Sequence, residues 1–269
     1  MEGMQLFKAF VLGVVEGLTE FLPISSTGHL ILVGHCIEFS STEGRVFEVV
    51  IQLGAVLAVC WLYREKIVRL CRGVLARSPD ETRLALAIAV AFLPAAAVGA
   101  ILIGPIKMHL FDPLVVAFAL ILGGVVILMV ERRRVVPTAR ATQDITLKHA
   151  LVVGIAQCFA MIPGTSRSGA TIVGGLLSGM SRQTATEFSF FLAIPTMLGA
   201  ALYDGWRHHH LLTPDDTAAI AVGFAASFIS ALLVVRALVR FVATHSFRVF
   251  AYYRICFGAL LLVWFGLAR

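Results

Sequence analysis

Long apolar stretches separated by short polar segments constrain this chain more than any other feature of its sequence. Of its 269 residues, 59% are hydrophobic, and the mean hydropathy of +0.90 is far above that of soluble domains. Apolar stretches of about 20 residues can cross a hydrocarbon core of about 30 Å as helices. The sequence therefore predicts an all-α polytopic membrane protein with a single membrane domain over residues 1–269.

Six apolar stretches are long enough to be full spans, and two others are broken. The spans are expected at about 46–62, 84–106, 113–130, 188–203, 217–235 and 249–268. The stretches 6–37 and 150–180 are interrupted by Pro and Gly, so each divides into two short helices. Irregular backbone is tolerated at membrane depth only where protein or water surrounds it. We therefore predict six transmembrane helices and two re-entrant helical hairpins.

The basic residues are distributed asymmetrically between the two sides of this topology. Fifteen of the 22 Lys and Arg residues fall in the segments 64–83, 132–148, 182 and 236–248, and only four fall on the opposite side. The positive-inside rule then places the first group in the cytoplasm and both termini outside it. The location of these charges matters more than the size of the net charge, +6, so no nucleic-acid partner is expected.

An internal repeat is visible at an offset of about 141 residues. Gly13 falls on Gly154, Glu16 on Gln157, and Ser25 on Ser166. The two copies, about 1–131 and 146–269, would each hold one hairpin and three spans. Because three crossings are an odd number, the second copy would be inverted. This predicts an inverted-topology repeat, an arrangement that places binding sites near the midplane.

The first hairpin carries two carboxylates within an apolar segment. Glu16 and Glu20 are four residues apart and share one helix face. On a soluble helix such a pair would be solvated surface, but charge inside a bilayer is costly and usually functional. Two carboxylates this close need a cation or a proton between them. Pro23 then ends the helix, and the hydroxyls that follow suit the start of a second helix.

The second hairpin has a tip that suits an anion. Residues 163–171 combine glycines, four hydroxyls and Arg167, directly before a predicted helix start. Backbone amides and the positive end of that helix would face the tip, and a guanidinium fork matches phosphate oxygens. The alternative is that Arg167 forms an ion pair with one of the embedded acids. If the repeat is inverted, the two tips meet and can bind a metal-bound polyphosphate.

The two tips together resemble a known family. The segment 16–29, Glu-Gly-Leu-Thr-Glu-Phe-Leu-Pro-Ile-Ser-Ser-Thr-Gly-His, and the segment 163–171, Pro-Gly-Thr-Ser-Arg-Ser-Gly-Ala-Thr, are similar to the signature motifs of bacterial undecaprenyl diphosphate phosphatases of the bacitracin-resistance type. The resemblance implies hydrolysis of undecaprenyl diphosphate to undecaprenyl phosphate and inorganic phosphate, which recycles the lipid carrier of cell-wall synthesis. It also implies the bacterial cytoplasmic (inner) membrane, with the active site open to the periplasmic side.

The resemblance assigns roles to individual residues. Glu16 and Glu20 would bind a divalent cation, Mg²⁺ or Ca²⁺, or manage protons, and Arg167 would bind the phosphates. Ser26 would be the nucleophile, with His29 as acid/base or alternative nucleophile. The expected partners are the polyprenyl diphosphate lipid and the bilayer, and a homodimer is left open. The residues expected to bind substrate are Ser25, Thr27, Gly164, Thr165, Ser166, Arg167, Ser168 and Thr171.

A different functional class shares this architecture. Inverted repeats with broken helices are common in secondary transporters, so a transporter or flippase for an anion or polyprenyl phosphate is the alternative. An acid pair with a serine and a histidine at the opposing tip favours the enzyme. Two other intramembrane features lie outside these motifs. Glu48 and Gln52 are either an outer shell of the site or structural, and Arg254 beside two tyrosines is interpreted as an interface anchor.

Overall fold

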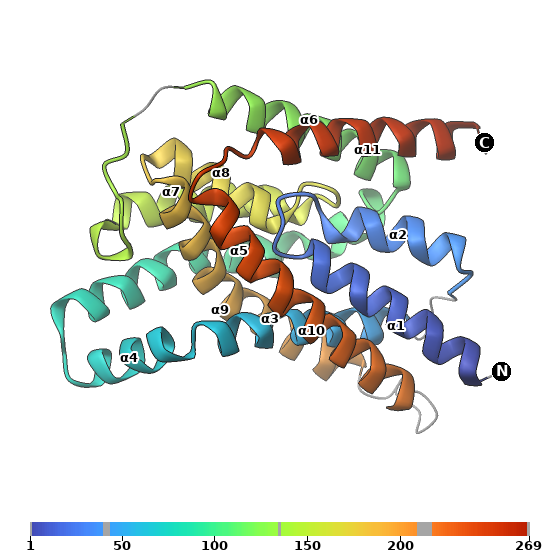
Figure 1. Cartoon of the computed structure of the whole chain (residues 1–269), viewed down its shortest axis with the longest axis horizontal. Coiled ribbons are helices and arrows are strands. Elements are labelled where there is room, and N and C mark those ends of the chain that lie inside the picture. The colour runs from blue at the N-terminus through green and yellow to red at the C-terminus, as the bar shows by residue number, and fades with distance from the viewer. Residues whose placement is uncertain (1, 40–43, 134–135, 209–216, 268–269) are drawn as a thin grey trace.

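The computed structural model describes residues 2–39, 44–133, 136–208 and 217–267, and the regular structure among them is helical (Figure 1). One isolated bridge pairs Ala139 with Met180 within these residues. The elements are α1 (Glu2–Thr19), α2 (Ser26–Cys36), α3 (Gly44–Leu62), α4 (Arg64–Leu75), α5 (Pro79–His109), α6 (Pro113–Glu131), η1 (Thr142–Asp144), α7 (Leu147–Cys158), η2 (Phe159–Met161), α8 (Arg167–Ser178), α9 (Arg182–His208), α10 (Thr217–Val242) and α11 (Arg248–Leu267).

Five helices of the described chain are long and apolar enough to cross a membrane, namely α5, α6, α9, α10 and α11. A sixth span results if α3 and α4, which meet at a bend of 76°, are counted as one. The chain is therefore a multi-pass membrane protein, as predicted, while the division into six spans and two re-entrant hairpins stays a prediction. The predicted end of the last span at 268 lies outside the described residues.

Several helices extend beyond the predicted spans because polar residues cap or continue them. α5 begins at Pro79, with Asp80 and Glu81 in its first turn, whereas the span was predicted from 84. Proline at the first helical position and acids in the first turn both favour a helix start. α10 continues to Val242, past the predicted end at 235. Hydropathy identifies only the apolar part of a helix, whereas α5 and α10 continue beyond it into polar sequence.

The two broken stretches form two helix pairs. α1 and α2 pack together, as do α7 and α8. In Figure 1 the α1–α2 pair extends toward the end of the molecule that holds both termini, and α7 and α8 lie toward the opposite end. Between the helices of each pair lie the breaks, residues 20–25 and 162–166. Together with the helix starts that follow them, they form tip 1 (residues 20–29) and tip 2 (residues 162–171). The inverted repeat stays a prediction.

Glycines allow α1 to approach α10 almost backbone to backbone. A Cβ atom on Gly13 would lie 2.2 Å from the carbonyl oxygen of Gly223, and one on Gly17 would lie 2.3 Å from that of Ser227. Small residues at helix crossings are the usual device for close packing in membranes. Glu16 is on the same stretch of α1, and its side chain is fully buried.

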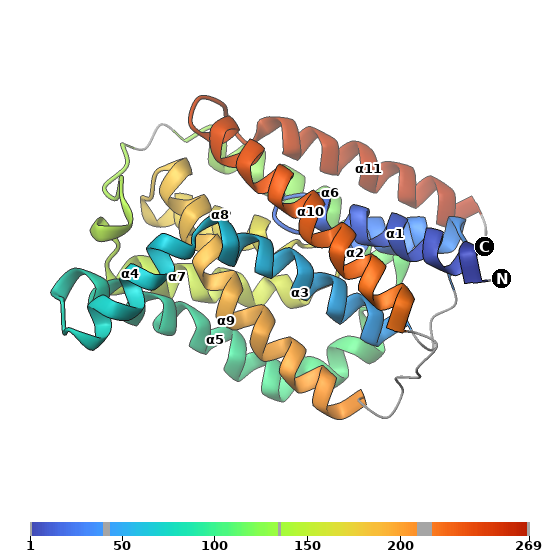
Figure 2. The ribbon, with the colours of Figure 1, turned by 60° about the horizontal axis from the view of Figure 1, so that its bottom comes forward.

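Tip 1 packs against α9, one of the helices at the centre of the molecule. α3 runs between α9 and α10 (Figure 2), and Phe21 of tip 1 packs edge-on against Phe190 of α9, with ring centroids 5.4 Å apart. Both phenylalanines are fully buried. Glu20, next to Phe21 in the chain, is thus anchored to the core of the molecule.

Candidate functional site

Tip 1 and tip 2 are in direct contact. Ser168 Oγ, in the first turn of α8, donates a hydrogen bond of 2.8 Å to the carbonyl oxygen of Leu22. Arg167 Nη2 donates to Glu20 Oε1 at 3.1 Å. These residues are more than 140 positions apart in the chain, so the contact exists only in the folded protein.

The carboxylate of Glu20 connects the two tips. Its Oε2 atom accepts a hydrogen bond of 2.6 Å from Ser26 Oγ, while Oε1 accepts from Arg167. The Glu20 side chain is 8% exposed and that of Arg167 is 12% exposed. In such a poorly solvated place charge-assisted hydrogen bonds are strong. The arrangement orients the serine hydroxyl and places a proton acceptor directly beside it.

Arg167 has further contacts that hold its guanidinium in place. Nη1 donates to the carbonyl oxygen of Ser189 at 3.1 Å, Nη2 lies 3.2 Å from Met197 Sδ, and the guanidinium lies 5.3 Å from the centroid of the Phe21 ring. Its buried Nε has no hydrogen-bond partner in the described part of the chain. The ion pair between Arg167 and an embedded acid is thus present, and the acid is Glu20. The Nε–H group of Arg167 is left for another acceptor.

Glu16 is a fully buried carboxylate whose two oxygens have no hydrogen-bond partner among the described residues. An unpaired buried carboxylate is strongly unfavourable unless a proton or a cation neutralises it. This unsatisfied acid fits the predicted divalent cation. No group of three or more His, Cys, Asp or Glu residues with metal-site geometry is found within the described ranges. Remaining ligands would have to be hydroxyl, amide, water or substrate oxygens.

A cavity of about 180 Å³ lies between the tips. Since a water molecule occupies about 30 Å³ in the liquid, this space suits a phosphate group but not a prenyl chain. Its lining includes the predicted residues Glu20, Ser25, Ser26, Thr27, Gly164, Ser166 and Arg167, together with Gln52 of α3 and Met197 of α9.

The hydroxyls of α8 divide into two groups. Ser166 caps the helix by accepting from the Gly169 amide at 3.1 Å, and it borders the cavity. Ser168 and Thr171 are almost fully buried, and Thr171 Oγ1 bonds Ser189 Oγ of α9 at 2.7 Å. These last two side chains join the tip to its surroundings and do not line the cavity, and neither does Thr165.

His29 faces α11, away from the carboxylate of Glu20. Its Nδ1 lies 2.7 Å from the carbonyl oxygen of Ser25, and its Nε2 lies 2.6 Å from the hydroxyl of Tyr253. The ring also stacks on Phe257, with centroids 4.3 Å apart. Because a carbonyl oxygen only accepts, Nδ1 carries the proton, and in the neutral ring Nε2 accepts from the tyrosine. His29 therefore buttresses Ser25 beside the cavity.

Sequence reasoning missed the role of Arg254. The interface-anchor interpretation is wrong, because this side chain is fully buried and donates to carbonyl oxygens of both tips. Its two tyrosine neighbours are typical of a membrane interface, and nothing local distinguishes a buried arginine from an anchoring one. Ser189 and Met197 were missed for the same reason, since α9 carries no recognisable motif at those positions.

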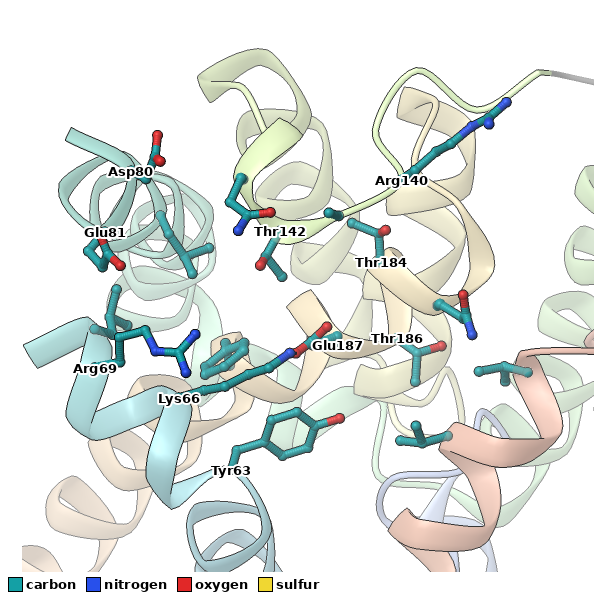
Figure 3. A pocket seen from close by; sticks show the side chains of 18 residues that line it. Tyr63, Lys66, Arg69, Asp80, Glu81, Arg140, Thr142, Thr184, Thr186 and Glu187 are labelled. Atoms are coloured by element: carbon teal, nitrogen blue, oxygen red, sulfur yellow. The ribbon is translucent and has the colours of Figure 1, made fainter. Parts of the chain in front are cut away.

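A larger cavity, of about 420 Å³, lies at the end of the molecule that holds the basic segment of α4 (Figure 3). Lys66 forms an ion pair with Glu187 there, and Arg69, Arg140 and Glu81 also line it. Both signs of charge are interspersed, and none of the predicted site residues contributes to its lining. It is distinct from the cavity between the tips.

Comparisons with known proteins identify the family of this chain. The family model described as bacitracin resistance protein BacA matches residues 9–260. A protein named undecaprenyl-diphosphatase 2 from Shewanella oneidensis is 60% identical over 263 residues, which cover 97% of this chain and 98% of that protein. Undecaprenyl-diphosphatase 3 from Acinetobacter baylyi is 57% identical, with 97% and 98% covered, and an undecaprenyl-diphosphatase from Bordetella petrii is 54% identical, with 97% of each covered. The chain belongs to the family of the bacitracin resistance protein BacA.

Proposed function

We propose that this protein is an undecaprenyl-diphosphate phosphatase, which hydrolyses undecaprenyl diphosphate to undecaprenyl phosphate and inorganic phosphate. It is a membrane hydrolase that recycles a lipid carrier for peptidoglycan and other cell-wall polymers, an activity that confers bacitracin resistance. Relatives that match almost the whole chain are named for this activity. The observation that carries the proposal is the Glu20 carboxylate bonded to Ser26 and to Arg167 from the two opposing tips.

The diphosphate is expected to enter the cavity between the tips. Arg167 would bind its oxygens, and the first amides of α2 and α8 would add their partial positive charge. Ser25, Thr27, Gly164 and Ser166 line this space, whereas Thr165, Ser168 and Thr171 would act by shaping tip 2. The prenyl chain would remain outside, among the apolar helices.

Ser26 is the nucleophile that the geometry favours. Its oxygen would form a bond to the terminal phosphorus while the bond from that phosphorus to the bridging oxygen breaks. The bridging oxygen leaves as part of undecaprenyl phosphate, and the serine proton passes to Glu20, 2.6 Å away. Water would then cleave the phosphoserine, releasing inorganic phosphate and returning a proton to the serine. His29, as acid/base or alternative nucleophile, would first have to leave Tyr253.

A divalent cation, Mg²⁺ or Ca²⁺, fits the unsatisfied Glu16 together with Glu20. Hard oxygen ligands suit both cations. When bound, such a cation would neutralise charge on the diphosphate. Glu16 and Glu20 would hold it on the tip 1 side, and Arg167 would hold phosphate oxygens on the tip 2 side.

The remaining expectations concern the surroundings of the site. We propose that the protein lies in the bacterial cytoplasmic membrane with its site open to the periplasm, because the basic segments lie at the end of the molecule opposite the termini. A homodimer remains a prediction.

The decisive experiment is phosphate release from a C55-prenyl diphosphate by the purified protein in detergent, with Mg²⁺ or Ca²⁺ and again with chelator. Release that needs the cation and is lost in Arg167→Ala supports the proposal. No release by well-folded protein, across both metals, would contradict it and direct attention to transport of the lipid or anion in liposomes.

A further inference from the structure

Arg254 of α11 is a buried arginine whose five N–H groups are all used. Nε donates to the carbonyl oxygen of Leu120 at 3.2 Å. Nη1 donates to those of Pro23 at 3.2 Å and Thr165 at 2.9 Å. Nη2 donates to those of Ala119 at 3.2 Å and Gly164 at 3.0 Å. An arginine has five such donors and no acceptor, so this side chain is fully satisfied by main-chain oxygens.

The five acceptors belong to three separate segments. Pro23 is in tip 1, Gly164 and Thr165 are in tip 2, and the other two carbonyls are in the middle of α6. One side chain of α11 thus ties both tips to α6. Gly123 of α6 makes room for it, because a Cβ atom there would lie 2.1 Å from Nη2 of Arg254.

These bonds set the direction in which the amides of tip 2 point. In a trans peptide the C=O and N–H bonds point to opposite sides. With the Thr165 carbonyl directed at Arg254, the amide of Ser166 is directed away from it. Ser166 borders the cavity between the tips, and its backbone has a φ of 71°, which non-glycine residues rarely adopt. A strained conformation of this kind persists only where surrounding contacts impose it.

The charge of Arg254 adds to this effect. No acid forms an ion pair with it in the part of the chain that the structure describes, and a guanidinium stays protonated in proteins. A positive charge therefore lies behind the two tips, on the side away from the cavity. From there the positive charge of Arg254 partly offsets the repulsion that Glu16 and Glu20 exert on an anion, and so favours anion binding in the cavity.

We propose that Arg254 is a positioning residue of the phosphatase, which acts through the carbonyls of Pro23, Gly164 and Thr165 without touching the substrate. It keeps the two tips at a fixed distance and orientation around the diphosphate. The inference rests on the proposed phosphatase function.

The test compares Arg254→Lys and Gly123→Ala with the unaltered protein. Lysine keeps the charge but carries three donors on one nitrogen, so it cannot reach three segments. Alanine at 123 would displace the guanidinium, the far end of a long side chain, without removing it. We expect both variants to stay folded, to lose about 10- to 100-fold in kcat/KM, and to be inhibited by inorganic phosphate only at higher concentration.

The matched control is Arg182→Lys. Arg182 donates to Glu131 from Nε at 2.9 Å, and neither residue lines the cavity between the tips. This variant should keep the inhibition constant for inorganic phosphate. The proposal would be overturned if Arg254→Lys kept the kcat/KM and the phosphate inhibition of the unaltered protein. It would also be overturned if the loss of activity only matched the loss of folded protein. If Arg254→Lys does not fold, Gly123→Ala decides in the same way. Phosphate release by the unaltered protein tests the phosphatase function separately.

Discussion

Ser25 and Ser166, which are 141 positions apart, adopt nearly the same rare backbone conformation, with φ 70° and ψ 100° in the first and φ 71° and ψ 118° in the second. Each directly precedes a helix whose N-terminus borders the same cavity. A non-glycine residue at positive φ costs on the order of 1–3 kcal/mol. The side chains differ in use: Ser166 caps α8, whereas Ser25 forms no side-chain cap and offers its carbonyl to His29. The backbone geometry is therefore what the two tips share.

The nucleophile can be identified by comparing Ser26→Ala with His29→Gln. Ser26 touches Glu20 inside the site, whereas both ring nitrogens of His29 are bonded elsewhere. We expect Ser26→Ala to lower kcat for phosphate release by at least about 100-fold, and His29→Gln to lower it by less, since it removes only support for Ser25. Ser178→Ala, whose hydroxyl bonds a carbonyl at the far end of α8, is the control. An equal or greater loss in His29→Gln would assign the nucleophile to the histidine.

The Glu20–Arg167 pair should contribute to stability as well as to turnover. Removing one partner of a buried ion pair leaves the other unpaired and typically costs about 3–5 kcal/mol. We expect Glu20→Gln to lower the thermal unfolding temperature in detergent, and the double variant Glu20→Gln/Arg167→Met to recover part of that loss. Lys66→Met is the matched control, because the Lys66 side chain is 51% exposed in its ion pair and such pairs contribute about 0–1 kcal/mol. Additive effects of the two substitutions would show that the pair is not coupled.

The close approach of α1 to α10 should not tolerate a larger residue at Gly17. A Cβ atom there would lie 2.1 Å from Ser230 Oγ and 2.8 Å from the amide nitrogen of Ala231. Gly17→Val would push the helices apart, cost about 1–3 kcal/mol or more, and displace the neighbouring Glu16. We expect a lower unfolding temperature and a weaker dependence of activity on the divalent cation. Gly3→Val, on the same helix with nothing within 4 Å, should change neither; equal effects of the two substitutions would contradict the packing argument.

The polar segment before α7 should be sensitive to acid. Hydrogen bonds of 2.9 Å from the amides of Arg140 and Ala141 stabilise the charged form of Asp144 and lower the pKa of its carboxyl group. A lowered folded-state pKa gives a stabilisation that is complete above the ordinary Asp range, near pH 4, and is lost as the pH falls through the folded-state value. Unfolding temperatures of the protein and of Asp144→Ala should differ at pH 7 and converge in more acidic solution. A difference that does not change with pH would exclude this carboxylate as the cause.

The candidate site was predictable from the sequence to the extent that it depends on local motifs. Glu20, Ser26, Arg167 and Ser166 carry chemistry that is out of place in an apolar segment, and the structure brings all four to one cavity. His29 belongs to the same motif and, three residues after Ser26, lies on the same side of α2, yet its ring bonds the hydroxyl of Tyr253 on α11. Which partner such a side chain meets depends on the neighbouring helices.

Membrane insertion and the position of most helices were determined by the sequence alone. Transfer of a helix into a bilayer depends on the polarity of its own residues, so hydropathy and breaks at Pro or Gly are enough to locate α5, α6, α9, α10 and α11 and the two helix pairs. Tertiary structure decided the burial of Arg254, the contact between Glu20 and Arg167 and the bend between α3 and α4. These features depend on packing between segments that are remote in the chain, or on the surroundings of the bend, and no local pattern of residues encodes such contacts.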